Sequence, residues 1–225
     1  MNRIALRNAV FVAVLALLGA SAGLLAYYGL GHADAIDDSP HLIRLADKLI
    51  ARGQSGEGLG PDRQAMLLAV VDPGFAARQG VDMDTPGGGM TAITRSLAQR
   101  LDFDGFYPGV ARIRHRAYAR GLDERLSKRQ IFALWLETVE MGRASDGWMK
   151  GFFMASRVVY NRPPAKLTDR QFLRLVAVVA APTKFRLEGR DPALDERVDR
   201  VERLLAGTCA RANAGDFWLK GCAAT

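Results

Sequence analysis

An uncharged, strongly apolar run near the N-terminus constrains this chain more than any other feature. The run extends from Asn8 to Gly31 without Asp, Glu, Lys or Arg, and Arg3 and Arg7 precede it. A helix of this length crosses the hydrocarbon core of a bilayer, and positive charge before a span keeps the preceding end cytoplasmic. We therefore predict a cytoplasmic N-terminus over 1–7 and a single-pass anchor over 8–31 in the inner (cytoplasmic) membrane, with the remaining chain on the extracytoplasmic face.

A cleaved signal peptide is the alternative interpretation of the same run. Ala20-Ser21-Ala22 resembles a cleavage site. The apolar residues continue beyond it through Leu24 and Tyr28, which favours a retained anchor. Both interpretations export the domain that follows.

The rest of the chain has the length and composition of one ordinary globular domain. The 225 residues are 49% hydrophobic and 24% charged, which is enough apolar material for a sizeable core. The net charge of +7 favours anionic partners such as phosphate groups, nucleic acid or acidic lipid headgroups, without selecting among them. His and Cys residues show no zinc-type spacing, so we predict no metal site from them.

Helical periodicity dominates after the anchor, and strand-like alternation is almost absent. The predicted fold class is all-α, with a linker over 32–60, one domain over 61–206 and a tail over 207–225. Ser127 and Thr168 are predicted helix N-caps. The predicted helical segments are Pro61 through Val70, Thr91–Leu101, Val110–Leu126, Ser127 through Val139, Lys150–Tyr160, Thr168 through Val179 and Asp195–Leu205.

The two cysteines, Cys209 and Cys222, both lie in the predicted tail. In an exported protein they are able to close a short loop as a disulfide. Two unpaired thiols are the alternative, and the spacing alone does not decide between them.

A motif with one unexpected residue follows the first predicted helix of the domain. It reads Val71-Asp72-Pro73-Gly74-Phe75, then Arg78, Gly80 and Asp82, and the glycine-rich turn Gly87-Gly88-Gly89 comes after it. This order resembles the peptidoglycan glycosyltransferase (transglycosylase) domain of penicillin-binding proteins and monofunctional biosynthetic transglycosylases, glycosyltransferase family 51. That family has Glu-Asp-x-x-Phe-x-x-His-x-Gly-x-Asp here, so Val71 stands at the position of its catalytic glutamate.

The second and third family motifs are also partly kept. In the second, Thr94 matches, while Arg95 and Ser96 replace a pair of glutamines. In the third, Arg112 keeps a positive charge and His115 replaces a functional carboxylate.

The fourth and last motifs complete a resemblance that spans roughly residues 62–205. Lys128 is kept in the fourth, where Trp135 replaces a tyrosine and Glu137 an asparagine, and Arg197 matches the last motif. The resemblance implies a lysozyme-like helical glycosyltransferase domain. It also implies lipid II or peptidoglycan glycan strands, the membrane and cell-wall synthesis proteins as partners, a divalent cation as cofactor, and no nucleic acid. The substrate-binding residues that it implies are Thr94, Arg95, Arg112, Lys128 and Arg197.

Glycan polymerisation by such a domain needs a carboxylate that accepts a proton from the attacking hydroxyl. Such a general base raises the reaction rate by roughly 10²- to 10⁴-fold. Valine cannot accept a proton. Asp72 is one candidate base, although it projects about 100° away from position 71 around a helix. Glu137 is the other candidate. A turn-forming role for Asp72 and a solvated role for Glu137 are the alternatives.

Two further segments allow a functional and a structural interpretation. Arg112, Arg116 and Arg120 form one row on a predicted helix, where they either bind a pyrophosphate or make a solvated basic face. The apolar segment Trp148–Met154 either contacts lipid or belongs to the core.

Three hypotheses follow from the sequence. The first is a membrane-anchored transglycosylase-like pseudoenzyme that binds lipid II, glycan or a cell-wall synthesis protein. The second is an active divergent glycosyltransferase in which Asp72 or Glu137 is the base. The third is a peptidoglycan hydrolase, which would also need a properly placed acid.

Overall fold

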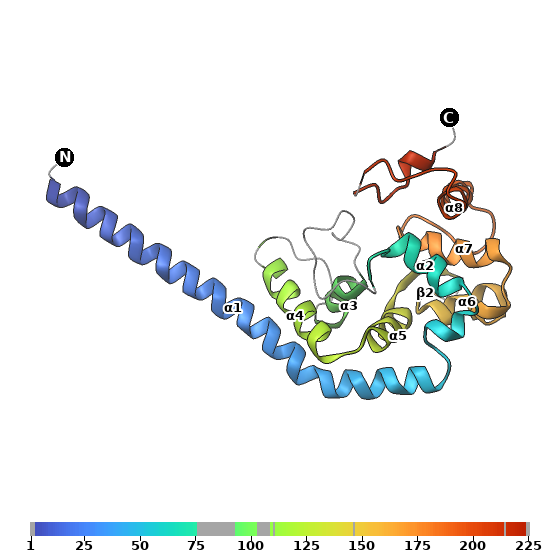
Figure 1. Cartoon of the computed structure of the whole chain (residues 1–225), viewed down its shortest axis with the longest axis horizontal. Coiled ribbons are helices and arrows are strands. Elements are labelled where there is room, and N and C mark those ends of the chain that lie inside the picture. Colours follow the sequence, from blue (N-terminus) through green and yellow to red (C-terminus); the bar gives the residue numbers. More distant parts are fainter. Residues whose placement is uncertain are drawn as a thin grey trace.

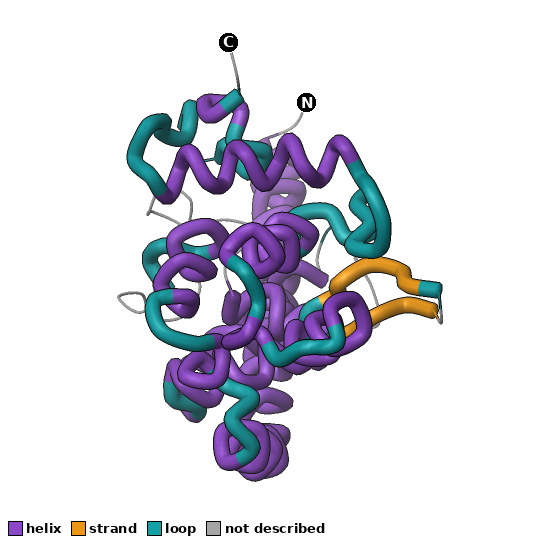
Figure 2. Tube along the Cα trace, turned by 90° about the vertical axis from the view of Figure 1, so that its right-hand side faces the viewer, coloured by secondary structure: helices purple, strands orange, loops and turns teal. Residues whose placement is uncertain are grey.

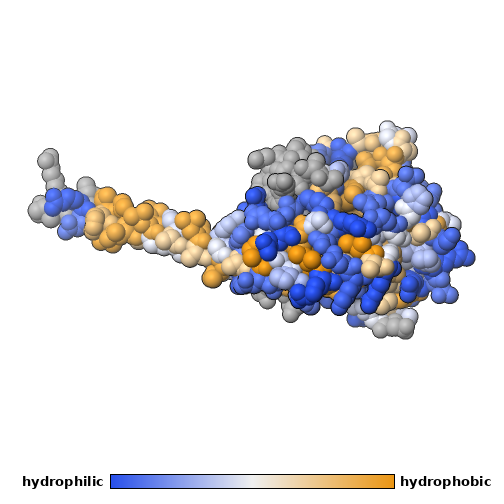
Figure 3. All heavy atoms as spheres, turned by 60° about the horizontal axis from the view of Figure 1, so that its bottom comes forward, coloured by the Kyte–Doolittle hydropathy of each residue, from blue (hydrophilic) through white to orange (hydrophobic). Residues whose placement is uncertain are grey.

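Helix α1 (Arg3–Ala51) is the longest element of the computed structural model, and its first half projects away from the rest of the molecule (Figure 1). The structure describes residues 3–75, 93–102, 109, 111–145, 147–213 and 215–223. The projecting half exposes large apolar side chains, among them Phe11, Leu17 and Leu25 at 63%, 68% and 73% exposure. Figure 3 shows this apolar surface beside a largely hydrophilic face of the domain. The described part of the chain thus contains one helix apolar enough to span a membrane, with a mean hydropathy of 2.2.

The second half of α1 lies within the range 32–60 that we predicted as a linker, and it packs against the helices that follow. Ala35, Leu42, Ala46 and Leu49 lie on one face of the helix and are buried. They pack against α4 (Ala111–Arg125) and α5 (Lys128–Thr138). The spacing of these apolar residues is helical, but only tertiary contacts reveal that the face they form is covered.

Close approach of α1 and α4 depends on residues without bulky side chains. A Cβ added to Gly31 would lie 2.6 Å from Cγ of Arg114, and one added to Gly121 would lie 2.6 Å from Cβ of Ala35. Polar contacts flank this seam, including Tyr118 Oη to Asp38 Oδ2 at 2.6 Å. The contact between α1 and the domain therefore begins directly after the apolar run.

Helix α1 bends before its end (Figure 1), and Pro40 supplies the cause. Proline has no N–H, so the carbonyl of Ile36 loses its helical donor. The hydroxyl of the buried Ser39 donates to that carbonyl at 2.7 Å and satisfies it.

The domain is helical around one core, with α1 passing beneath it and α8 above (Figures 1 and 2). Helix α5 lies at the centre, because all six residues from Ile131 to Leu136 are buried, as expected for a helix that is apolar on every side. The rings of Phe152 and Phe172 extend the core in an edge-to-face contact at 5.6 Å. The remaining helices are α2 (Arg63–Val71), α3 (Ile93–Asp102), α6 (Phe152–Tyr160), α7 (Asp169–Val178) and α8 (Pro192–Leu205), with short 3₁₀ turns η1 (Gly56–Leu59), η2 (Pro164–Lys166) and η3 (Lys220–Cys222).

The predicted all-α class is confirmed, with one small addition. Strands β1 (Glu140–Ala144) and β2 (Gly147–Lys150) form an antiparallel hairpin that pairs Arg143 with Trp148. Gly142 has φ +85°, and a Cβ there would lie 2.8 Å from the Pro182 carbonyl oxygen, so glycine permits the tight contact. The period-2 signal is short and interrupted by glycines, which is why the sequence did not reveal these strands.

The helix starts that we predicted from capping residues are confirmed. Ser127 and Thr168 each accept a hydrogen bond from the backbone N–H three residues later, and Gln130 and Gln171 complete two capping boxes. The predicted helix that begins at Thr91 is described only from Ile93 onward.

Candidate functional site

The carboxylate of Asp72 links the end of α2 to the start of α3. Asp72 is the C-cap of α2 and only 2% exposed. Its Oδ2 accepts the backbone N–H of Ile93 at 2.9 Å, and its carbonyl accepts the N–H of Phe75 at 3.0 Å. Val71, the preceding residue, packs partly buried against the core. Asp72 thus satisfies one of the N–H groups that a helix start leaves without a partner.

Lys128 stands beside this junction. Its ammonium group lies 5.1 Å from the centre of the Phe75 ring, a cation–π distance. It also forms an ion pair with Asp123, whose side chain is only 5% exposed. Lys128 therefore adds a positive charge near the first motif, and Asp123 partly balances it.

Three arginines from α3 and α4 form what we call the arginine cluster: Arg95, Arg112 and Arg116. Burial, followed by the repulsion of Arg116 and Arg112, lowers the pKa of the Arg95 guanidinium, so the three charges share one neighbourhood. Arg112 is exposed, and Nε of Arg116 is buried without a hydrogen-bond partner among the described residues. Neither Arg112 nor Arg116 forms an ion pair with another described residue. Such a cluster attracts an anion.

His115 lies next to the cluster and is 7% exposed. Burial, then the charges of Arg95 and Arg114, lower its pKa below the ordinary value. The imidazole is therefore neutral at neutral pH, and it adds no further charge to the cluster.

Two residues that depart from the family pattern contact each other. Nε1 of Trp135 in α5 donates to Oγ of Ser96 in α3 at 2.9 Å. Trp135 is 1% exposed, and the neighbouring Thr94 is 3% exposed. The pair fixes α3 against α5. Thr94 lies in the interior, so a substrate would contact it, as predicted, only if the surrounding side chains moved apart.

Glu137 lies at the opposite end of α5 from Lys128. It is exposed, and the separation of nine positions corresponds to about 13 Å along the helix. Arg100 reaches this end of α5, where its Nε donates to Thr138 Oγ1 at 3.2 Å. Burial lowers the pKa of Arg100 to about 10, and Glu140 partly opposes that shift. The described geometry thus separates Glu137 from the junction of Asp72 and Lys128.

Arg197 holds the C-terminal segment. It is 6% exposed, and it donates to the carbonyls of Ala177 at 3.2 Å and Phe217 at 3.1 Å. Burial, followed by Arg211 and Arg200, lowers its pKa to about 10, so it stays protonated at neutral pH. These contacts favour a structural role over the substrate contact that the resemblance implied.

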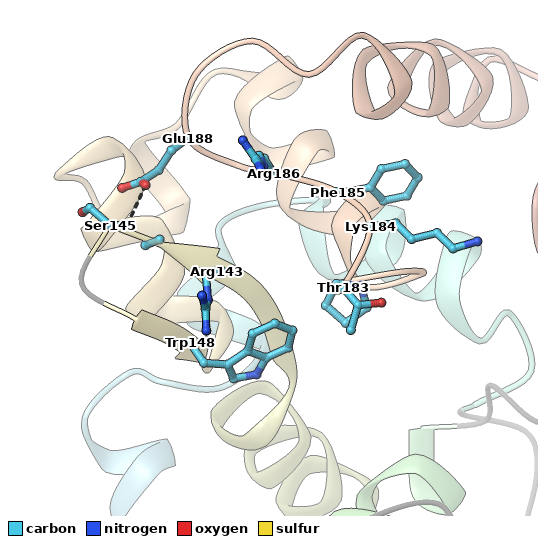
Figure 4. A pocket seen from close by; sticks show the side chains of 10 residues that line it. Arg143, Ser145, Trp148, Thr183, Lys184, Phe185, Arg186 and Glu188 are labelled. Carbon is cyan, nitrogen blue, oxygen red and sulfur yellow. Dashed lines mark hydrogen bonds between the residues drawn. The ribbon is translucent and has the colours of Figure 1, made fainter.

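A second feature is a groove of about 570 Å³ between the hairpin and the segment that joins α7 to α8 (Figure 4). Arg143 and the 40%-exposed Trp148 line one wall, and Thr183 faces them from the other. The Glu188 carboxylate closes one end by accepting the N–H of Ser145 at 2.8 Å. Arg143 forms no ion pair within the described ranges.

Comparison with known proteins identifies the family. The family model described as Transglycosylase matches residues 76–206, more than half of the chain. This chain belongs to the transglycosylase family. A biosynthetic peptidoglycan transglycosylase from Burkholderia thailandensis is 26% identical over 151 residues, which is 61% of this chain. The match spans 57% of that protein's length.

The predicted resemblance to the transglycosylase family is therefore confirmed, and the site residues divide into three places. Asp72, Thr94 and Lys128 lie around the start of α3, where α2 and α5 meet it. Arg95 and Arg112 lie in the arginine cluster. Glu137 and Arg197 lie outside both groups of contacts. Arg78, Gly80, Asp82 and the turn over 87–89 lie outside the described residues.

The divalent cation implied by the transglycosylase family lacks a ligand set in the described part of the chain. No group of three or more His, Cys, Asp or Glu side chains there is placed to hold a metal ion. The described residues do not fit the ion, so no step proposed below involves one.

Sequence reasoning missed the groove, and the Trp148–Met154 segment divides between the two interpretations given for it. Trp148 and Met154 are exposed, at 40% and 57%, whereas Met149, Phe152 and Phe153 are buried. A tryptophan beside glycine and opposite an arginine in a hairpin was the available signal, but it requires the strands to be recognised first.

Proposed function

We propose that this member of the transglycosylase family is a membrane-anchored protein that binds lipid II or peptidoglycan glycan strands and has lost polymerase activity. The observation that carries the proposal is a contrast between the arginine cluster and the junction of α2 with α3. The cations for an anionic substrate are gathered, while position 71 holds valine and the neighbouring carboxylate is committed to the backbone.

The arginine cluster supports binding of a pyrophosphate. Guanidinium groups donate paired, charge-assisted hydrogen bonds to phosphate oxygens. Burial, followed by the repulsion of Arg116 and Arg112, lowers the pKa of Arg95, and a bound anion would relieve that repulsion. Lys128 supplies a further cation beside the first motif.

The groove supports binding of a glycan. The exposed indole of Trp148 offers an apolar face with a polar edge, the kind of surface on which sugar rings stack. Arg143 beside it suits the carboxylates that peptidoglycan carries on its peptides. Thr183 opposite adds a hydroxyl for hydrogen bonding (Figure 4).

An active divergent enzyme is the second candidate, with Asp72 or Glu137 as base. A base must reach the proton that it removes, at roughly 2.6–3.2 Å. Asp72 is buried and bonded to Ile93, and Glu137 lies about 13 Å along α5 from Lys128. These positions favour the inactive interpretation.

The remaining parts of the proposal concern placement and partners. We propose that the apolar part of α1 is a retained span, with Arg3 and Arg7 on the cytoplasmic side. The paired Cys209 and Cys222 support an oxidising compartment for the domain, such as the periplasm. A cell-wall synthesis protein is the proposed protein partner, and 61–206 with the second half of α1 is the proposed domain.

The test is a lipid II polymerisation and binding assay on the full chain in detergent. We expect lipid II binding but no polymer from the unaltered protein, and loss of binding in Arg112→Ala. Arg157→Ala removes an exposed cation from α6 and serves as the matched control. Val71→Glu restores a carboxylate at the family position, and polymer from this variant alone supports a decayed site.

Polymer from the unaltered protein would overturn the inactive interpretation. Absence of lipid II binding by a folded protein would overturn the binding role. A circular dichroism spectrum and melting curve for each variant separate both results from unfolding.

A further inference from the structure

The C-terminal segment after α8 is a loop closed by a disulfide. Cys209 and Cys222 are paired, with their Cα atoms 5.2 Å apart. Inside the loop, the buried carboxylate of Asp216 accepts backbone N–H groups from Ala212, Lys220 and Gly221 at 2.7–2.9 Å. The loop therefore has an internal organising group besides the covalent bond.

An arginine row on α8 binds this loop through its main chain. The row is Arg197, Arg200 and Arg203, spaced three residues apart on one face. They donate to the carbonyls of Phe217 at 3.1 Å, Trp218 at 3.1 Å and Cys222 at 2.6 Å. The row fixes the returning half of the loop, and the disulfide together with the contacts of Asp216 to Ala212 and Arg211 ties the other half to it.

Arg211, on that other half, reaches the end of α2. Its Nη2 donates to the Val70 carbonyl at 2.7 Å and lies 3.5 Å from the Ala69 carbonyl. Pro73 has no N–H, so the Ala69 carbonyl has no helical donor. A cation also interacts favourably with the negative end of the α2 dipole. The contact lies directly before Val71 and Asp72.

We propose that the Cys209–Cys222 loop is a redox-dependent clasp that holds the carboxyl end of α2, and with it the Val71–Phe75 segment, through Arg211. With the disulfide intact, Arg211 is held at the Val70 carbonyl. When the bond is broken, only the contacts of Asp216 to Ala212 and Arg211 still tie the segment carrying Arg211 to the half that the arginine row holds, and its contact with the end of α2 weakens.

Opening requires a dithiol reductant. One thiolate of the reductant attacks Sγ of the half-buried Cys209, the S–S bond breaks, and Sγ of the buried Cys222 leaves as a thiolate and takes a proton. The second thiol of the reductant then attacks the mixed disulfide and releases the Cys209 thiol. Two electrons and two protons pass to the protein, and the reductant becomes a disulfide.

Hydrogen exchange on the full chain in detergent tests the clasp. The chain has only these two cysteines, so dithiothreitol acts at a single bond. We expect amides of residues 68–75 to exchange at least 10-fold faster after reduction, while amides in α7 keep their rates. Faster exchange confined to residues 209–222 would overturn the proposal.

A variant of the oxidised protein separates the clasp from a general loss of stability. Arg211→Ala should speed exchange over 68–75 as reduction does, while the loop itself stays protected by the disulfide and the arginine row. Arg190→Ala, at an exposed position between α7 and α8, is the control. Unchanged exchange over 68–75 in folded Arg211→Ala would also overturn the proposal. Neither readout uses lipid II, so the clasp and the proposed function succeed or fail separately.

Discussion

The arginine cluster and the arginine row use the same side chain for different ends. In the row, each guanidinium donates to a main-chain carbonyl and thereby holds the loop in place. In the cluster, Arg112 and Arg116 form no ion pair with a described residue, and burial, followed by the repulsion of both, lowers the pKa of Arg95. Cations that repel one another destabilise a fold unless an anion joins them. The hydrogen-bond and ion-pair partners of the arginines, not the residue type, thus distinguish the proposed binding region from the structural one.

The largest effect is expected when guanidinium groups are removed from the arginine cluster, and this tests whether the cluster binds an anion. We expect Arg112→Ala with Arg116→Ala to weaken lipid II binding about 100-fold, since two hydrogen bonds to a charged group contribute about 1.5 kcal/mol or more each. The free energy of unfolding should change by less than about 1 kcal/mol, because repulsion is relieved as contacts are lost. Titration of labelled lipid II and urea unfolding measure the two quantities. A large loss of stability with binding intact would place the cluster with the structural arginines.

The opposite result is expected in the row. Arg197→Ala removes donors from the Ala177 and Phe217 carbonyls and a cation from the faces of Phe217 and Trp218. We expect a loss of about 3 kcal/mol in the free energy of unfolding, with lipid II affinity retained in the folded fraction. Urea unfolding followed by tryptophan fluorescence measures the first quantity. Weaker lipid II binding at unchanged stability would return Arg197 to the binding residues.

Removing the disulfide should lower the free energy of unfolding slightly less than Arg197→Ala does. Cys209→Ser with Cys222→Ser opens a loop with a sequence separation of 13, for which loop-closure entropy gives about 3 kcal/mol as an upper value. The row still holds the returning half of the loop, so we expect about 2 kcal/mol. Thermal unfolding with and without dithiothreitol measures the loss, and the reductant should have no further effect on the double variant. An unchanged melting temperature would show that the row alone fixes the loop.

The smallest expected effect is on the stability of the fold at low pH. Burial alone would raise the pKa of Asp216, but the N–H groups of Gly221, Ala212 and Lys220 outweigh it and hold that pKa below the ordinary value. A carboxyl group whose pKa is lower in the folded state stabilises the fold above its unfolded pKa, and this contribution is lost as pH falls through the folded pKa. Stability should therefore decline below about pH 4, and Asp216→Asn should flatten that decline. A decline of the same slope in the variant would assign the acid sensitivity to other carboxylates.

Local signals in the sequence were enough for most of the helices and for the family. Capping residues such as Ser127 mark helix starts because they satisfy backbone donors locally. The roles of Asp72, Arg197 and Arg211 depend on groups 20 to 141 residues away. The sequence motif identified Asp72 and Arg197 as family positions, but only the fold shows that one binds the α3 backbone and the other binds the loop. Arg211 carried no local signal at all.

The unbroken passage of α1 from its exposed apolar part into the seam with α4 has a mechanical consequence. A helix turns by about 100° and rises 1.5 Å per residue. One residue inserted after Gly31 would turn the domain by about 100° around the helix axis relative to the apolar half of α1 and move it by about 1.5 Å along that axis, whereas a flexible tether would absorb both changes. The number of residues between the apolar run and Ala35 therefore sets both the orientation of the domain around the axis of α1 and its distance from the apolar run.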